Sequence, residues 1–506
     1  MIPKRLFPFS LRLALVASGV ALSAHADVKL PALFSDNMVL QQGVLVQLWG
    51  WADANEEVKV DCAGHKASIL CSGEGRWRMT LPKHKAGGPY TLTFSAHNTI
   101  TLTNVVFGEV WIASGQSNME WPLRAAFEAD KAMANSANSR IRLFTVTKRK
   151  ADAPVTDVKG AWQECGPASV ADFSAVAYYF ARDLQQAREV DVGVIHTSWG
   201  GSPAEVWMSE KVLAANPEYK QDILEAYPDQ LKKFQDALAQ WEKEKADAEK
   251  EAKEFKQGRP GPPWKPAELY NGMIAPLIPY SIKGAIWYQG ESNAGRARQY
   301  RSLFADLIKN WRRDWGLGDF TFLEVQLAPF MAIKDKPGES SWAELREAQE
   351  LAAKVLPKVG MAVITDVGEE KDVHPRKKEP VGARLALAAR GTAYGERIVY
   401  SGPTYKSINV KRGEAILHLT NIGRGLEARG GELKGFAIAG DDRKFVWAKA
   451  EIKGKKIHVS NPAVPQPVAV RFGWADYPVV NLWNKDGLPA SPFRTDDWPM
   501  ITARKK

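Results

Sequence analysis

The chain contains 506 residues, of which 45% are hydrophobic and 25% are charged, and its formal net charge is +10. This length and composition are typical of a globular protein of about two to four domains. The positive excess is mild for the size and no block of arginines concentrates it, so the sequence argues against nucleic-acid binding.

The first 26 residues have the pattern of a secretory signal peptide. A basic start (MIPKR) precedes an apolar run from Leu11 to Leu22, and Ala24 and Ala26 supply the small residues of a cleavage site. We therefore predict a signal peptide over 1–26 and export to the periplasm or the outside of the cell. No later apolar run is long enough to span a bilayer, so no membrane anchor is expected.

Short alternating segments follow over 27–104, among them VLVQLWGW, WRMTL and YTLTFSA, separated by Gly, Asn and Asp turns. This alternation predicts an N-terminal antiparallel β domain. Cys62 and Cys71 flank a short predicted hairpin, which in an exported chain predicts a disulfide between them. Cys165 would be left as a small buried side chain.

From 105 to 400 the pattern changes to strands that alternate with helices. The apolar segments VVFGEVWIAS, VDVGVIHTSWGG, IKGAIWYQGES, FTFLEVQLA and KVGMAVITDV alternate with amphipathic stretches such as FSAVAYYFARDLQQA. Such alternation indicates a parallel sheet covered by helices. A highly charged stretch over about 217–265 is predicted to be a solvated helical insertion without chemistry. Over 401–506 the short alternating segments return and predict a second β domain, so the fold class is α/β with flanking all-β domains.

One turn within this α/β region carries a candidate nucleophile. In GEVWIASGQSNMEW, residues 108–121, a buried strand ends at Gly115 and is followed at once by Ser117. A serine on a sharp turn after a strand is well placed to attack a substrate. The same residue type is also common in ordinary turns and at helix N-caps, so the stretch alone leaves both readings open.

A serine nucleophile needs a base, and two histidines fall in the α/β region. His196 lies inside the apolar strand VGVIHTSW, where a buried core histidine is expected. His374 lies in the polar loop EEKDVHPRKKEP after a predicted strand, where open sheets form their binding crevice. His374 is thus the preferred base, and Asp372 is the preferred carboxylate to orient its ring.

Two further loops at strand ends carry hydrogen-bond donors. Residues 198–201 (SWGG) offer backbone N–H groups, and residues 287–293 (WYQGESN) offer side-chain amides. Donors of this kind stabilise the oxyanion that forms when an acyl carbonyl is attacked. Each loop alone is a weak signal, because glycines form simple turns and Gln or Asn often caps helices.

The four loops together resemble a known family. GQSNM, SWGGSPAEVW, WYQGESNA, and DVHP followed by VGARLA resemble the sequence blocks of the sialate O-acetylesterase family. That family is a branch of the SGNH (GDSL-like) hydrolases, which also include bacterial esterases acting on acetylated plant polysaccharides. LFSDNMVLQQ near the start and NLWNKDGLPASPFRTDDWP near the end fit as well, so the resemblance covers essentially the whole mature chain.

The resemblance implies a role for individual residues. It makes Ser117 the nucleophile and His374 the base, and it assigns the oxyanion hole to the N–H groups of Ser117 and Gly201 with the side chain of Gln289 or Asn293. One position departs from the pattern: many SGNH enzymes place the acid three residues before the histidine, where this chain has Lys371. Asp372 is therefore the preferred acid, with Glu370 or Asp366 as alternatives.

The predicted activity is removal of acetyl groups from sugar hydroxyls, on O-acetylated sialic acid or on an acetylated plant polysaccharide, with neither metal nor organic cofactor. Bulky side chains near the predicted site favour a short acyl group, and aromatic side chains nearby suit a sugar ring. The bulky group is Met119, Trp121, Trp199 and Tyr288, and the aromatic group is Trp199, Trp207 and Trp287. Two alternatives remain open: a non-catalytic carbohydrate-binding protein, and a glycosidase that uses Glu291 with a second carboxylate.

Overall fold

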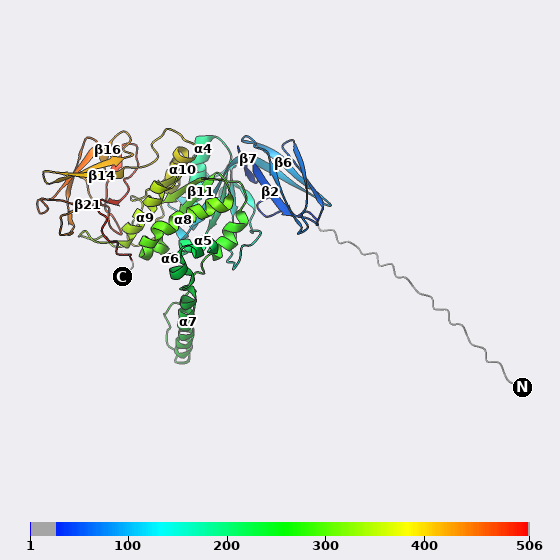
Figure 1. The fold of residues 1–506 in the computed structure, drawn as a ribbon, viewed down its shortest axis with the longest axis horizontal. Coiled ribbons are helices and arrows are strands. Elements are labelled where there is room, and N and C mark those ends of the chain that lie inside the picture. The colour runs from blue at the N-terminus through cyan, green and yellow to red at the C-terminus, as the bar shows by residue number, and fades with distance from the viewer. Residues whose placement is uncertain (2–26, 504–506) are drawn as a thin grey trace.

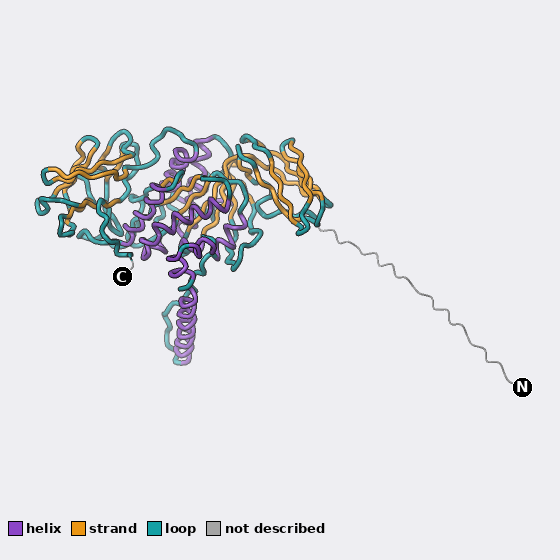
Figure 2. The backbone as a smooth tube through the Cα atoms, viewed as in Figure 1, coloured by secondary structure: helices purple, strands orange, loops and turns teal. Residues whose placement is uncertain are grey.

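The computed structural model describes Met1 and residues 27–503, so the predicted signal peptide after Met1 lies outside the described residues. Figure 1 shows three parts in a row, with β strands at the N-terminal end, a helix-covered sheet in the centre and further β sheets near the C-terminus. Figure 2 shows that helices are concentrated in the central part. No helix among the described residues is both long and apolar enough to cross a bilayer.

The central sheet has six parallel strands in the order β13-β12-β11-β7-β10-β8, with β9 antiparallel at one edge. This arrangement confirms the predicted α/β fold class, and the alternation of strands with helices accounts for it because parallel neighbours need a crossover connection. The strands are β7 (Thr99–Gly115), β8 (Asn138–Thr145), β9 (Trp162–Cys165), β10 (Val192–Ser198), β11 (Gly284–Tyr288), β12 (Thr321–Val325) and β13 (Val359–Ala362).

Helices cover both faces of this sheet, and successive residues of β7 show the two faces. Trp111 belongs to the apolar layer formed with α4 and α10, whereas Ile112 belongs to the layer formed with α8 and α9. Both side chains are fully buried. Each large apolar side chain buried in this way contributes about 1.5–3 kcal/mol.

Two of the helices that cover the sheet begin at a capping serine. Ser174 Oγ accepts the N–H of Ala177 at the start of α4, and Ser340 Oγ accepts the N–H of Ala343 at the start of α9. The α-helices longer than three residues are α1 (Ser117–Glu120), α2 (Ala129–Ala134), α3 (Pro167–Val170), α4 (Ala175–Arg188), α5 (Glu210–Ala215), α7 (Tyr227–Lys250), α8 (Ala297–Trp315), α9 (Ser341–Val355) and α10 (Glu379–Ala393).

The N-terminal β strands join the central sheet through β7. The first half of β7 pairs with β6 and β1, and its second half pairs with β10 and β11. The expected boundary at residue 104 therefore falls inside a strand that belongs to both sheets. The N-terminal strands are β1 (Val39–Gln41), β2 (Val46–Trp51), β3 (Glu57–Cys62), β4 (His65–Leu70), β5 (Arg76–Leu81) and β6 (Gly87–Ser95).

The predicted disulfide is wrong, because Cys62, Cys71 and Cys165 are all free and buried. In the β3–β4 hairpin Cys62 pairs with His65 beside the turn, whereas the N–H of Cys71 donates to the carbonyl of Glu56 at the open end. Six residues of strand separate the two positions, about 20 Å at 3.3 Å per residue. Disulfide-linked Cα atoms lie no more than about 7 Å apart, so the register excludes the bond.

The charged insertion forms a projection from the central part. Helix α7 has no buried residue, and Figure 1 shows it extending away from the body of the molecule. The returning segment packs on the helix itself, since Trp241 Nε1 donates to the carbonyl of Gln257 and the Trp241 ring meets Phe255 edge-on. The projection is thus largely self-contained.

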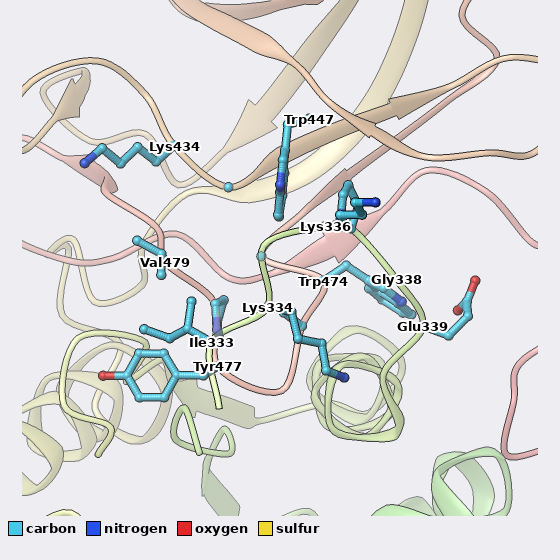
Figure 3. A pocket seen from close by; sticks show the side chains of 15 residues that line it. Ile333, Lys334, Lys336, Gly338, Glu339, Lys434, Trp447, Trp474, Tyr477 and Val479 are labelled. Atoms are coloured by element: carbon cyan, nitrogen blue, oxygen red, sulfur yellow. The ribbon is translucent and has the colours of Figure 1, made fainter. Parts of the chain in front are cut away.

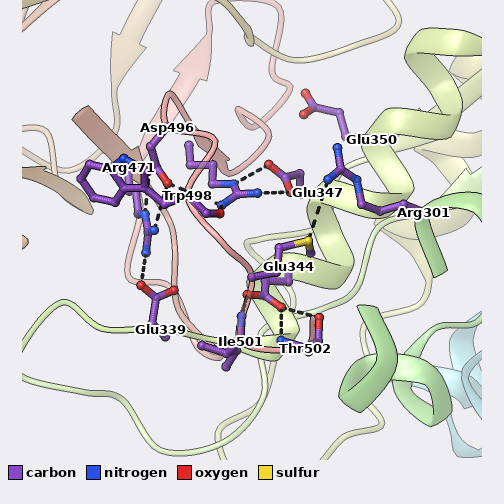
Figure 4. Close-up of polar contacts among 12 residues, drawn as sticks. Arg301, Glu339, Glu344, Glu347, Glu350, Arg471, Asp496, Trp498, Ile501 and Thr502 are labelled. Carbon is purple, nitrogen blue, oxygen red and sulfur yellow. Dashed lines mark hydrogen bonds and ion pairs between the residues drawn. The ribbon is translucent and has the colours of Figure 1, made fainter. Parts of the chain in front are cut away.

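The C-terminal part consists of small antiparallel sheets, and the end of the chain returns to the central part. Figure 4 shows the carboxylate of Glu344, on α9, bonded to the tail. Glu344 accepts the N–H groups of Ile501 and Thr502 and the Thr502 hydroxyl. The strands are β14 (Thr404–Lys411), β15 (Glu414–Thr420), β16 (Leu426–Ala428), β17 (Phe436–Ala439), β18 (Val446–Trp447), β19 (Lys449–Lys453), β20 (Lys456–Ser460), β21 (Ala469–Phe472), β22 (Leu482–Asn484) and β23 (Phe493–Arg494).

Candidate active site

Three neighbouring strands end level with one another at the carboxyl edge of the sheet. Gly115 of β7 pairs with Ser198 of β10 on one side and with Tyr288 of β11 on the other. A crevice at such a place, outside the carboxyl ends of parallel strands, is the usual ligand site of open α/β sheets. Gly115 has φ +137°, and a Cβ there would lie 2.2 Å from the Tyr288 carbonyl oxygen, so the turn requires glycine.

The turn after Gly115 brings Ser117 to His374, although 257 residues separate them in the chain. Ser117 Oγ lies 2.8 Å from His374 Nε2, within hydrogen-bond distance. His374 comes from the loop that follows β13, as the sequence predicted. The structure thus brings together the serine and the histidine that were selected from the sequence.

Asp372 is the carboxylate nearest the His374 ring among the three candidates. Its Oδ1 lies 3.4 Å from His374 Nδ1 and accepts the backbone N–H of His374 at 2.8 Å. Asp366 is instead held by both terminal nitrogens of Arg384, and Glu370 accepts the backbone N–H of Ile333. This geometry favours Asp372, although a ring contact of 3.4 Å is long for a hydrogen bond.

The His374 ring has an asymmetric environment. One face stacks on Trp121, with ring centroids 5.1 Å apart, and the His374 side chain is 28% exposed. Burial lowers the pKa of His374 below its usual value, the Asp372 carboxylate opposes this, and the Lys378 ammonium adds to it. A histidine with a lowered pKa is neutral near pH 7 and can therefore accept a proton.

The glycine loop lies close to Ser117. A Cβ added to Gly200 would lie 3.3 Å from Ser117 Cβ and 3.7 Å from Ser117 Cα. The N–H of Gly200 is already used, because it donates to Glu120 Oε2 at 2.6 Å. Among the hydrogen bonds between described residues, none uses the N–H of Ser117 or that of Gly201.

The two predicted side-chain donors lie beneath the glycine loop. Gln289 is fully buried, and its Nε2 donates to Asn293 Oδ1 and to the Ser202 carbonyl. Asn293 is 1% exposed and donates to Glu205. In this arrangement both amides support the loop, and Gln289 would have to rotate to meet an oxyanion.

A buried polar cluster under the site was not identified from the sequence. Asn118 Nδ2 donates to Glu291 Oε1 at 2.6 Å and to the Val373 carbonyl at 3.0 Å, while Asn118 Oδ1 accepts Lys378 Nζ at 2.5 Å. Lys378 is 1% exposed, and burial lowers its pKa to about 7. Since Asn118 follows Ser117 and Val373 precedes His374, the cluster connects the two loops that carry the reactive pair.

The remaining predicted positions divide between core and surface. His196 is buried as expected, its Nε2 lies 2.6 Å from Ser198 Oγ, and burial lowers its pKa to about 4, so it stays neutral. Trp207 and Trp287 are fully buried, which corrects their assignment as sugar-facing side chains. Trp199 remains partly exposed and contacts Trp264 edge-on.

Within the described part of the chain, no group of His, Cys, Asp and Glu side chains is arranged to hold a metal ion. The groups brought together at the candidate site are a hydroxyl, an imidazole and backbone N–H donors. Groups of these kinds can carry out acyl transfer.

Comparisons with known proteins agree with this chemistry. A family model described as carbohydrate esterase, sialic acid-specific acetylesterase, matches residues 107–390. The chain belongs to this family. A crystal structure of a carbohydrate acetylesterase from Xanthomonas citri is 39% identical, covers 93% of this chain and 100% of its own, and superposes with a TM-score of 0.82.

Curated relatives carry the same family name over nearly their full length. Mouse sialate O-acetylesterase is 28% identical and covers 95% of this chain and 96% of its own. Human sialate O-acetylesterase is 26% identical and covers 93% of each chain. Membership in this esterase family identifies the chain as an enzyme, in preference to a non-catalytic binding protein or a glycosidase based on Glu291.

Proposed function

We propose that this acetylesterase removes acetyl groups from carbohydrate hydroxyls with Ser117 as nucleophile, His374 as base and Asp372 as the carboxylate that orients the base. The observation that carries the proposal is the 2.8 Å contact between Ser117 Oγ and His374 Nε2, beside a glycine loop. Membership in the acetylesterase family supports acetyl as the acyl group that the enzyme removes.

The reaction proceeds by two acyl transfers. Ser117 Oγ attacks the acetyl carbonyl while His374 Nε2 takes the hydroxyl proton, and the imidazolium then gives this proton to the departing sugar oxygen. Water attacks the acetyl-enzyme with His374 again as base, which releases acetate and restores the serine. The Asp372 carboxylate stabilises the imidazolium in both steps.

The oxyanion is stabilised by the N–H groups of Ser117 and Gly201 in this proposal. Neither N–H group donates a hydrogen bond to another described residue. Both groups are therefore available to donate to the negative charge that forms on the carbonyl oxygen in the transition state. Asn293, whose Nδ2 donates a single hydrogen bond, or Gln289 after a rotation that frees one of its two N–H groups, would complete the hole, as the sequence resemblance implies.

The substrate is proposed to be an acetyl ester of a sugar, cleaved faster than butyryl or longer esters. The mouse and human relatives are named for sialate esters and the Xanthomonas protein for carbohydrate esters. The proposal therefore includes O-acetylated sialic acid, and the sequence resemblance adds acetylated plant polysaccharides. The predicted signal peptide over 1–26 adds the proposal that the enzyme acts after export.

Two substitutions test the mechanism. Ser117→Ala and His374→Ala are each expected to lower acetate release by about three to six orders of magnitude, because each removes a chemical role and no core contact. Acetate release and thermal unfolding should be measured on the same preparations. Ser72→Ala, at an exposed serine in the turn between β4 and β5, is the matched control. Parent-like activity in either active-site variant contradicts the proposal.

A further inference from the structure

A cavity lies between the central part and the C-terminal sheets, and Ser117 is not among the residues that line it. It has a volume of about 180 Å³ and is lined by the loop 333–339 after β12, by Trp447 of β18, and by the segment 473–479 after β21. Figure 3 shows Trp447 and Lys434 on one side of this space and Ile333, Lys334 and Tyr477 on the other. The volume is small and fits a single ring better than an extended chain.

Trp447 is an exposed aromatic side chain held in a fixed position. Trp447 is 44% exposed, which is unusual for a tryptophan. Its Nε1 donates to the Asp335 carbonyl at 2.7 Å, so the indole is anchored across the boundary between the two parts. A fixed indole with an accessible face is a suitable platform for the apolar face of a sugar ring.

Among the residues that line the cavity, lysines outnumber carboxylates. Lys334 is paired with Asp476 at 2.7 Å, and Glu339 is paired with Arg471 at 2.9 Å. Lys336 and Lys434 have no acidic partner among the described residues, and Figure 3 shows them on either side of Trp447. Two ammonium groups without partners favour an anionic ligand.

We propose that this cavity binds a sugar ring that carries a carboxylate. The ring would stack on the Trp447 indole, and the carboxylate would accept hydrogen bonds from Lys336 or Lys434. A neutral sugar would use only the indole, so the two lysines distinguish acidic from neutral sugars.

The cavity is coupled to the catalytic loop by direct contacts. Tyr477 Oη donates to the Gly368 carbonyl at 3.3 Å, and the N–H of Ile333 donates to Glu370 Oε1 at 3.2 Å. Gly368 and Glu370 belong to the loop that carries His374. An acidic unit of a larger glycan would thus be held beside the loop that positions the base, an extension that rests on the proposed function.

Binding is tested on the full-length Ser117→Ala protein, so that no turnover interferes. Sodium glucuronate and sodium N-acetylneuraminate are titrated by calorimetry, with glucose as the neutral control. We expect the dissociation constant of at least one acid to be ten-fold or more below that of glucose. Trp447→Ala and the double variant Lys336→Ala/Lys434→Ala should each weaken acid binding about ten-fold. Lys455→Ala, at an exposed lysine of the same part of the chain, is the matched control.

The outcomes separate this inference from the proposed function. Equal binding of glucose and both acids, no binding of either acid, or parent-like binding in the Lys336→Ala/Lys434→Ala variant overturns the inference. With Ser117 intact, the cavity variants should hydrolyse a chromogenic acetyl ester at the parent rate, because that substrate has no acidic sugar. If Ser117→Ala proves fully active, the proposed mechanism fails while the binding result still stands.

Discussion

At the scale of single residues, the proposed mechanism makes the reactivity of Ser117 depend on the charge state of His374. The imidazole accepts the serine proton only when it is neutral. Burial lowers the pKa of His374, whereas the Asp372 carboxylate raises it. The two influences have opposite signs, so removing one of them has a predictable direction.

The pH dependence of kcat/KM should therefore have an ascending limb with a midpoint below 6.5, the ordinary histidine pKa. The rate should rise as pH increases through the lowered pKa and stay level above it, because the neutral base is then fully populated. Asp372→Asn should move the midpoint to still lower pH and reduce the plateau. Initial rates with an acetyl ester from about pH 4 to 8 measure both effects. An upward shift of the midpoint in Asp372→Asn would contradict the assignment.

Lys378 provides a second test at this scale, as a positioning residue. Lys378→Met should lower kcat about ten-fold or more with little change in KM, because Asn118 loses a charged donor and the Ser117 and His374 loops lose a shared anchor. The buried Glu291 carboxylate would also lose its neighbouring charge.

The neighbouring residue supplies the control for this variant. Lys377 is exposed, so Lys377→Met removes the same charge from the same loop without disturbing the buried cluster. Steady-state kinetics and circular dichroism on both variants separate a catalytic loss from unfolding. Equal losses in the two variants would show that the cluster has no positioning role.

At the scale of elements, the strands and their carboxyl ends could be predicted from the sequence. Apolar runs broken by glycine and polar residues marked where β7, β10 and β11 end, and level ends of parallel strands bring their loops together. This local pattern made Ser117 and His374 candidates, and the resemblance of the four loops to the acetylesterase family selected them. The boundary near residue 104 was less apparent, because the alternating pattern of TITLTNVVF continues without a turn.

Features set by distant pairing could not be predicted. Lys378 lies in the charged run RKK, which is typical of a solvated loop, and only the fold buries it against Asn118. The separation of Cys62 from Cys71 follows from the strand register, which the spacing alone leaves open. Whether a tryptophan such as Trp287 is core or platform depends equally on which helices cover its strand.

The α7 projection gives a prediction about a whole element. Replacing residues 229–259 by a short Gly-Ser linker should shift the melting temperature by only a few degrees, because α7 buries none of its residues. Hydrolysis of a chromogenic acetyl ester should remain within about two-fold of the parent, since the excised segment holds none of the proposed catalytic groups. Calorimetry and kinetics check the two expectations. Aggregation of the excised protein would reveal a stabilising contact of the projection.

At the scale of the whole molecule, the central and C-terminal parts are joined by buried polar contacts. Arg346 of α9 is fully buried and donates to the carbonyls of Leu327 and Ala328 and to those of Ala475 and Asp476. A single guanidinium thus satisfies carbonyl groups from both parts. These bonds and those between the tail and Glu344 hold the C-terminal part in a fixed position against the central part.

Removal of the tail tests this connection. A chain that ends at Pro499 should lose about 3 kcal/mol or more of stability, because the buried Glu344 carboxylate loses the donors from Ile501 and Thr502. Thermal unfolding measures the loss, and a chain that ends at Ala503 is the control because it keeps both residues. The same unfolding temperature in the two truncated chains would refute the stabilising role of the tail.

The uninterrupted strand β7 restricts how this enzyme can be recombined with others. Exchange of an N-terminal β domain between related proteins is ordinarily made at a flexible linker. Here the crossover would cut a strand whose first half pairs with β6 and whose second half ends at the nucleophile turn. A graft that alters the length of β7 by one residue would turn every following side chain to the opposite face. Chimeras are therefore expected to work only when the donor supplies β7 through Gly115 in the same register, so that the strand and the serine are inherited as one unit.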